Sequence, residues 1–249
     1  MSRQFHPLTF LRVTLLVLAS YLAVFMLPAS NDRASWQLVT ATAVLFGLII
    51  MTLIRQAMER RQQLLGAVRI ELNKLRRVYH IAKNLSVVAP QRFRGWFTDV
   101  HGFLYEYLNT FAGKNFADYD SANAAFRKLS YHIYTIPELE TKKEEALFDD
   151  LLHTTGVVAE ARQHIKELSE NRLPLYGWLV TSIMLGGFIA SVLVTLGANQ
   201  YDRFVSGTLL VCATFSVDIL CRIDSLRAER KMLSKRYVDN VARLELSRK

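Results

Sequence analysis

Acidic and histidine side chains gather at one place in the sequence where they could bind a metal ion. Glu145, Asp149 and His153 follow one another at four-residue intervals, so a helix would align them on one face, with Asp150 beside them. Oxygen ligands of this kind suit a divalent cation such as calcium. A calcium loop also needs a turn that offers backbone carbonyl groups, and the sequence predicts no such turn here. We therefore interpret these residues as a solvated acidic face and predict no metal site.

Asp218 is a second residue with possible chemistry, because it lies within a hydrophobic stretch. A charge inside a membrane is costly unless it is paired or hydrated. Arg222 follows four residues later, so on a helix the two side chains could form an ion pair near the cytosolic interface. Two alternatives give Asp218 a function: it could line a water-filled path, or it could face Arg12, which is predicted at a similar depth. The sequence leaves these interpretations open.

The sequence contains none of the short motifs that mark common enzyme sites. Neither the phosphate-binding loops Gly-x-x-x-x-Gly-Lys-Ser/Thr and Gly-x-Gly-x-x-Gly, nor the Gly-x-Ser-x-Gly elbow, nor the His-Glu-x-x-His zinc motif occurs. The six histidines are scattered without ligand spacing. Cys212 and Cys221 lie nine residues apart on one predicted helix, so they cannot form a disulfide with each other. We predict no catalytic residue, no cofactor and no enzyme activity.

The sequence also contains hydrophobic stretches that are long enough to cross a membrane, and Asp218 and both cysteines lie within or at the end of one of them. A transmembrane helix needs about 20 mainly apolar residues. Four stretches meet this requirement, and they form two pairs, each joined by a short polar loop. Trp36, Tyr176 and Trp178 lie near the ends of these stretches, as is typical of aromatic side chains at a membrane interface. The predicted spans are residues 9–27, 36–54, 175–196 and 204–221.

The net charge of +9 could indicate a nucleic-acid-binding protein, but the positions of the basic residues favour membrane topology. Residues 55–94 contain ten Lys or Arg and two acids, and residues 222–249 contain nine against four. Each loop within a pair of spans has one arginine, Arg33 or Arg203. Basic residues are enriched on the cytosolic side of membranes. We therefore expect both termini and residues 55–174 in the cytosol, at the inner membrane, and no nucleic-acid partner.

The predicted fold class is all-α: a polytopic membrane protein with four transmembrane helices and a helical cytosolic domain between the second and the third. Apolar residues in the cytosolic part recur at helical spacing. They predict that the second span continues into the cytosol until Pro90, and that an aromatic face beginning at Phe93 belongs to the core. Pro137 is expected to open the last helix of this domain. The expected segments are a first transmembrane pair (1–54), the cytosolic helical domain (55–174), a second transmembrane pair (175–221) and a basic cytosolic tail (222–249).

Small residues on the third span could allow two helices to approach closely. Gly186 and Gly187 are each followed, four residues later, by another small residue, Ala190 and Ser191. Similar surfaces lie on the fourth span: Ser206, Gly207 and Ala213. We expect these residues mainly to pack helices within the chain, with a contact between copies as the alternative.

Several short features follow one another between Glu71 and Leu196. They are Glu71-Leu72, Ala89-Pro90, the aromatic helix with Tyr105 and Tyr107, Glu160-Ala161-Arg162, and the run from Leu173-Pro174 to Trp178. Through these features the stretch resembles the bestrophin-like membrane proteins, which have two helices, a helical cytosolic segment and two more helices. After the last span the chain departs from that family, because the family's acidic-Pro-Phe sequence is replaced by Ile223-Asp224-Ser225-Leu226.

This resemblance implies a homo-oligomeric anion channel in the lipid bilayer, with its pore lined by the second span and the cytosolic extension of that span. Arg55, Arg60 and Arg61 would then raise the anion concentration at the cytosolic mouth, and Asp218 is a further candidate pore residue. Topology alone also explains these arginines. Two other functions fit the same sequence: a proton-driven stator-type subunit, or a membrane-anchored sensor or scaffold whose cytosolic helices bind a protein partner while its basic flanks contact anionic lipid.

Overall fold

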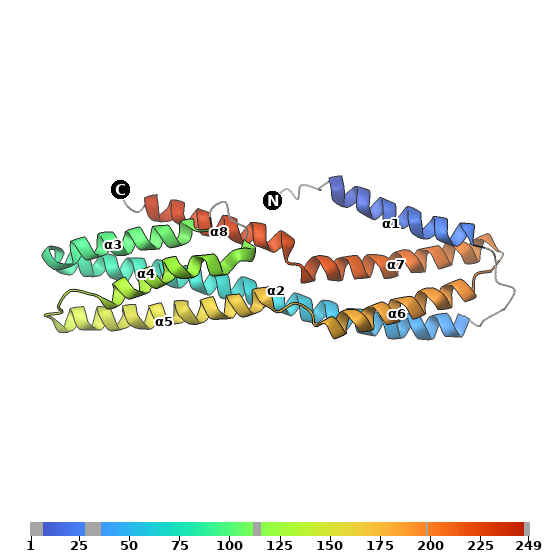
Figure 1. Ribbon diagram of the computed structural model, residues 1–249, viewed down its shortest axis with the longest axis horizontal. Coiled ribbons are helices and arrows are strands. Elements are labelled where there is room, and N and C mark those ends of the chain that lie inside the picture. The colour runs from blue at the N-terminus through green and yellow to red at the C-terminus, as the bar shows by residue number, and fades with distance from the viewer. Residues whose placement is uncertain (1–6, 28–35, 112–115, 198, 247–249) are drawn as a thin grey trace. The chain divides into compact units, whose positions relative to one another are not determined.

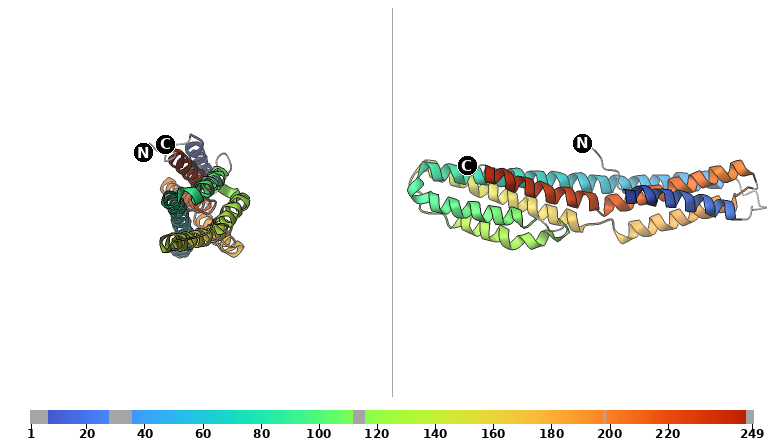
Figure 2. Two further views of the ribbon diagram at one scale, coloured as in Figure 1. Left: turned by 90° about the vertical axis from the view of Figure 1, so that its left-hand side faces the viewer. Right: turned by 90° about the horizontal axis from the view of Figure 1, so that it is seen from above.

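The computed structural model describes residues 7–27, 36–111, 116–197 and 199–246, and every regular element in these ranges is a helix. Contacts divide the chain into two compact units. Unit 1 comprises residues 1–59 and 173–225, and unit 2 comprises residues 60–172 and 226–249. Within each unit the helices lie lengthwise beside one another (Figures 1 and 2). One long helix, α2 (Trp36–Val88), contributes residues to both units.

Unit 1 is a group of apolar helices. It contains the first part of α2 together with α1 (Pro7–Met26), α6 (Leu175–Val194) and α7 (Gln200–Asp224). The ring of Phe46 stacks on that of Phe188 at 5.8 Å between centroids, and the hydroxyls of Thr42 and Ser191 are hydrogen-bonded at 2.8 Å. These contacts join α2 to α6.

The contact between α1 and α7 depends on one glycine. The Tyr21 hydroxyl is hydrogen-bonded to that of Thr208 at 2.9 Å, and Arg203 donates to the carbonyl of Phe25 at 2.9 Å. A Cβ atom on Gly207 would lie 2.7 Å from the ring of Tyr21, too close for any real contact. Gly207 therefore allows α1 to lie directly on α7.

Large apolar side chains remain exposed on unit 1. Leu18 on α1 is 56% exposed, Ile183 on α6 is 63% exposed, and Phe204 on α7 is 58% exposed. Three helical stretches of the described residues are long and apolar enough to cross a membrane, and the apolar stretch Thr14–Met26 of α1 is shorter. Lipid is the solvent that suits such a surface. The long stretches are Trp36–Val88, Lys142–Val194 and Gln200–Leu244.

Unit 2 is a helical bundle with its own hydrophobic core. Proline organises one of its turns: α2 ends at Val88, and Pro90 is the first residue of α3, as predicted. The aromatic face of α3 is buried in this core, with Phe93 and Tyr107 fully enclosed. Besides the end of α2, unit 2 contains α3 (Pro90–Asn109), η1 (Phe116–Ala122), α4 (Asn123–Tyr134), α5 (Lys142–Glu170) and α8 (Arg227–Leu246).

Two parts of unit 2 differ from expectation. The prediction that Pro137 opens the last helix is wrong, because α5 begins at Lys142 and Thr141 is its N-cap, accepting a hydrogen bond from the backbone of Glu144 at 3.3 Å. The basic residues expected as a tail form α8, and its Leu233 and Tyr237 are completely buried. The C-terminal helix is therefore part of the core of unit 2.

Candidate functional site

Among the described residues of unit 2, the most buried charged group is the carboxylate of Glu71. On α2 it lies between Val68 and Leu75 on the helix face that packs into the core, and its exposure is zero. A carboxyl group in such a place needs hydrogen-bond partners, because burial without them is strongly unfavourable. Three phenols supply them. Tyr107 donates to Oε1, while Tyr119 and Tyr237 donate to Oε2 at 2.9 and 2.5 Å.

Arg162 on α5 is the positive partner of this carboxylate. Its Nη1 lies 3.7 Å from Oε1 of Glu71 and also donates to the hydroxyl of Tyr107. Its Nη2 donates to Oδ1 of Asn123 at 2.7 Å. The guanidinium carbon lies 4.6–4.9 Å from three ring centroids, an arrangement in which aromatic faces stabilise a cation. These rings belong to Tyr107, Tyr119 and Phe126.

We call this cluster (Glu71, Arg162, Tyr107, Tyr119 and Tyr237) the buried charge centre. Burial raises the pKa of Glu71, while the charge of Arg162 and the three phenol hydrogen bonds oppose that rise. Burial and the nearby Glu71 raise the pKa of each tyrosine well above its ordinary value, so the phenols remain protonated donors at neutral pH. The centre joins α2, α3, η1, α5 and α8 through one carboxylate.

The three predicted mouth arginines lie in different surroundings. Arg55 is 79% exposed and pairs with Glu59 at 2.9 Å on the same helix. The Nε of Arg60 donates to the carbonyl of Leu168 at 3.1 Å. Arg61 is half-buried, and its Nε lies 2.7 Å from a carboxylate oxygen of the buried Glu229. Among the three, Arg55 alone presents a largely exposed side chain.

Asp218 is buried within unit 1 and lies 2.7 Å from Arg222, its i+4 neighbour on α7. The side chain of Arg12, which the sequence offered as another partner, lies outside the described residues. Another acid of unit 1, Asp224, accepts a hydrogen bond from the backbone of Leu173 at 3.0 Å, and so joins the end of α7 to the start of α6.

The small residues of α6 separate into two groups. Ser191 is buried and contacts Thr42 of α2. Gly186, Gly187 and Ala190 are exposed, and a Cβ atom on either glycine would meet no other atom within 4 Å in the described chain. Within the chain, therefore, only Ser191 of the four is used for the contact with α2.

The acidic face predicted on α5 is exposed, with Glu145, Asp149 and His153 all open to solvent. Asp150 beside them forms an ion pair with Arg77 at 2.9 Å. No group of three or more acidic, histidine or cysteine side chains in the described ranges has a geometry that could hold a metal ion.

Comparison with known proteins gives the family. The Bestrophin-like domain matches residues 35–222, which is most of the chain. The chain belongs to the bestrophin-like family. It is a membrane protein by that membership and by its apolar helices. No curated protein matches the sequence.

Solved structures give the same fold. Two variants of a bacterial bestrophin homologue from Klebsiella pneumoniae align with TM-scores of 0.67 and 0.69, each at 11% identity. The alignments cover 94% and 95% of this chain and 98% of the homologue. A structure described as a membrane protein aligns at 0.67 and 11% identity over 94% of this chain and 99% of its own. The bestrophin-like fold thus extends over nearly the whole chain.

Sequence reasoning found part of the buried charge centre. Glu71, Tyr107 and Arg162 are among the residues that carry the family resemblance, but the sequence does not predict that they meet at one point. Tyr119 and Tyr237 were missed. One signal was available: Glu71 occupies an apolar position of the helical pattern on α2, and a buried acid there requires donors from other elements.

Proposed function

We propose that the protein is a homo-oligomeric anion channel of the cytoplasmic membrane, with four spans and with unit 2 and both termini in the cytosol. Membership of the bestrophin-like family supports this proposal. α1 is proposed as the fourth span because it has 20 residues, the length that a bilayer requires. The orientation follows from the basic residues that flank the spans.

The observation that carries the channel proposal is the exposed face of α2. Leu48 and Met51 are exposed on this face, and Arg55 follows four residues after Met51, so it continues the same stripe. If copies of α2 surround a common axis, this stripe supplies an apolar constriction followed by a ring of positive charge. An apolar constriction next to a positive ring favours the passage of anions over cations. Glu59, which pairs with Arg55, lies one helical turn further from Met51. The positive charge of Arg55 is therefore closer to the apolar constriction than the negative charge of Glu59.

Planar-bilayer recording of the purified protein tests this function. We expect chloride currents whose reversal potential follows the chloride gradient. Arg55→Glu should shift the reversal potential toward that of the cation, because it places a negative ring beside the constriction. Arg127→Glu, on the exposed surface of α4, is the matched control and should leave selectivity unchanged.

Two results would contradict the proposal. One is a folded, oligomeric protein that conducts no ion at any voltage, pH or calcium concentration, and this result would favour the anchored scaffold instead. The other is a wild-type current carried by cations.

A further inference from the structure

A pocket of unit 2 lies between α2 and the C-terminal helix α8, apart from the buried charge centre. It consists of two adjoining cavities of about 240 and 390 Å³. Both are lined by Leu72, Arg76, Asn240 and Arg243, so the two cavities lie on either side of the same side chains. We call the two cavities together the α2–α8 pocket; one of its ends is cationic and the other is apolar.

Four arginines line the cationic end. Arg69 and Arg76 come from α2, and Arg236 and Arg243 come from α8. Asp239 is the one carboxylate among the residues that line it, so the lining carries a net positive charge of three. Within the described ranges, none of the four guanidinium groups has a carboxylate oxygen within 4.0 Å. Positive groups that converge in such excess over negative ones form a site for an anion.

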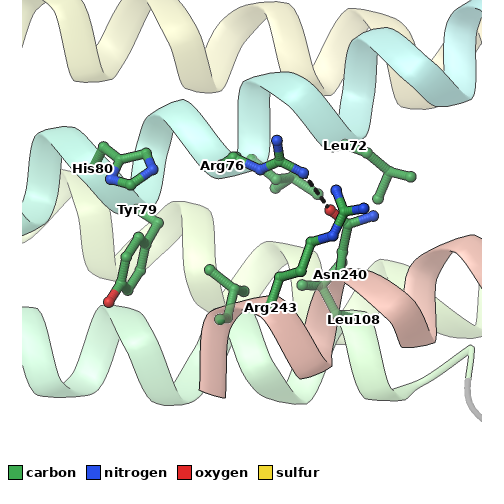
Figure 3. Close-up of a pocket in the computed structure, with 9 residues that line it drawn as sticks. Leu72, Arg76, Tyr79, His80, Leu108, Asn240 and Arg243 are labelled. Atoms are coloured by element: carbon green, nitrogen blue, oxygen red, sulfur yellow. Dashed lines mark hydrogen bonds between the residues drawn. The ribbon is translucent and has the colours of Figure 1, made fainter. Parts of the chain in front are cut away.

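Figure 3 shows how two of these arginines are aimed. The guanidinium groups of Arg76 and Arg243 approach the same place from opposite helices, beside Asn240. Oδ1 of Asn240 accepts a hydrogen bond from Arg76 at 2.9 Å, which holds that guanidinium in place. Planar guanidinium groups bind phosphate oxygens through paired hydrogen bonds, and an orientation fixed in advance lowers the entropy cost of binding.

The other end of the pocket is apolar. Its lining includes Leu75, Tyr79, Leu108 and Leu244, which belong to the hydrophobic core of unit 2. An inorganic ion would leave this surface uncovered, whereas an apolar group attached to the anion would cover it. The volume of about 240 Å³ at this end limits that group to a single ring or a short chain.

We infer that the α2–α8 pocket binds an organic phosphate, with the phosphate at the arginine end and a small aromatic or aliphatic group at the apolar end. A carboxylate needs only one guanidinium, while four of them match the higher charge of a phosphate monoester. The same chemistry is offered by a soluble phosphate ester and by a lipid headgroup with its first carbons. This inference does not depend on ion conduction.

Titration calorimetry on the full-length protein in nanodiscs of zwitterionic lipid tests the inference. The probes are phenyl phosphate, inorganic phosphate and phenol. We expect phenyl phosphate to bind about tenfold more tightly than inorganic phosphate or better, because burial of the ring adds the hydrophobic contribution. Phenol, which lacks the charge, should give no measurable binding.

Substitutions of lining residues test whether the phosphates bind in the α2–α8 pocket. Arg243→Gln should weaken the binding of both phosphates by about tenfold or more, the usual effect of losing a charged hydrogen bond. Arg236→Gln is a second, exposed position for the same test. Leu244→Gln should weaken phenyl phosphate and leave inorganic phosphate unchanged. Arg94→Gln, exposed on α3 outside the pocket, is the matched control, and the unfolding temperature of each variant reports its folding.

A further arm distinguishes the two sources of ligand. Nanodiscs that contain phosphatidic acid should reduce the apparent affinity for phenyl phosphate if a lipid headgroup is the natural ligand, and should leave it unchanged if the ligand is soluble. Both results agree with the inference. Equal affinities for phenyl phosphate and inorganic phosphate would overturn it, as would unchanged binding in folded Arg243→Gln and Arg236→Gln proteins.

Discussion

A single buried carboxylate organises unit 2 at the scale of residues. Glu71 receives three phenol hydrogen bonds, and its counter-charge, Arg162, is itself enclosed by aromatic rings. A buried ion pair of this kind adds less to stability than its contacts suggest, because both charges have left water. Removal of one partner is strongly destabilising, because the charge of the other partner then remains buried without compensation.

Replacing Glu71 by leucine should therefore destabilise the protein by about 3–5 kcal/mol, because Arg162 would remain buried without a counter-ion. Denaturant unfolding in detergent micelles, followed by tryptophan fluorescence, measures this loss. The matched control is Glu160→Leu at an exposed position of α5, which should change the free energy of unfolding by about 0.5 kcal/mol or less. Equal effects of the two substitutions would mean that the centre adds nothing.

The raised pKa of Glu71 predicts a pH dependence. Between the ordinary value of 4.5 and the higher pKa of the folded state, the folded protein holds a proton that the unfolded chain has lost. Stability from this group is thus complete below pH 4.5 and is lost as the pH rises through the folded-state pKa. Glu71→Gln removes this contribution, so the wild-type protein should lose stability relative to the variant as the pH rises. Unfolding midpoints of both proteins along a pH series measure the difference, and a constant difference would contradict the assignment.

At the scale of elements, helix ends and helix contacts show what sequence patterns can and cannot predict. Pro90 was placed correctly because a proline both ends one helix and starts the next. Pro137 was misplaced because Thr141, with Glu144 three residues later, is the stronger helix start, and its capping bond outweighs the preference of proline for the first turn. The pattern also identifies Gly207 as a small packing residue, but it cannot name Tyr21 as the partner, since this contact joins helices that lie far apart in the sequence.

Gly207→Ala should separate α1 from α7, because the added Cβ atom would lie 2.7 Å from the ring of Tyr21. We expect a loss of about 1–3 kcal/mol, the usual effect of overpacking. Thermal unfolding in detergent measures it. Combining Gly207→Ala with Tyr21→Ala should remove the clash and recover part of that loss. Gly186→Ala is the control, because its new methyl group meets no other atom within 4 Å in the described part of the chain; a loss there as well would indicate a contact with another molecule.

At the scale of the whole molecule, hydrophobic length and charge carried most of the prediction. The all-helical fold and the membrane location could be predicted because apolar runs and basic flanks are local properties of the sequence. The packing of α8 into the core of unit 2 could not be predicted, because its basic residues obscure the few apolar positions, such as Leu233 and Tyr237, that face the core. The meeting of five elements at Glu71 was hidden for a related reason: long-range contacts leave no period in a single sequence.

The orientation remains a prediction that reporter fusions can measure. Alkaline phosphatase fused after Lys249 should be inactive and green fluorescent protein fused there should fluoresce, because we expect the C-terminus in the cytosol. A truncated fusion after Ser30, in the loop between the first two proposed spans, should give the opposite pair of signals. An active phosphatase at Lys249 would reverse the proposed topology.

The position of Tyr237 so late in the chain has a consequence for biosynthesis. The carboxylate of Glu71 is made early, yet one of its three donors arrives only with the last helix, after residues 173–225 have been synthesised. Until then, the apolar surface that α8 covers stays open to chaperones and proteases. A ribosome that stops before residue 237 therefore leaves a chain in which the helices of unit 1 are made and the core of unit 2 is unfinished, with apolar surface exposed that the completed protein buries.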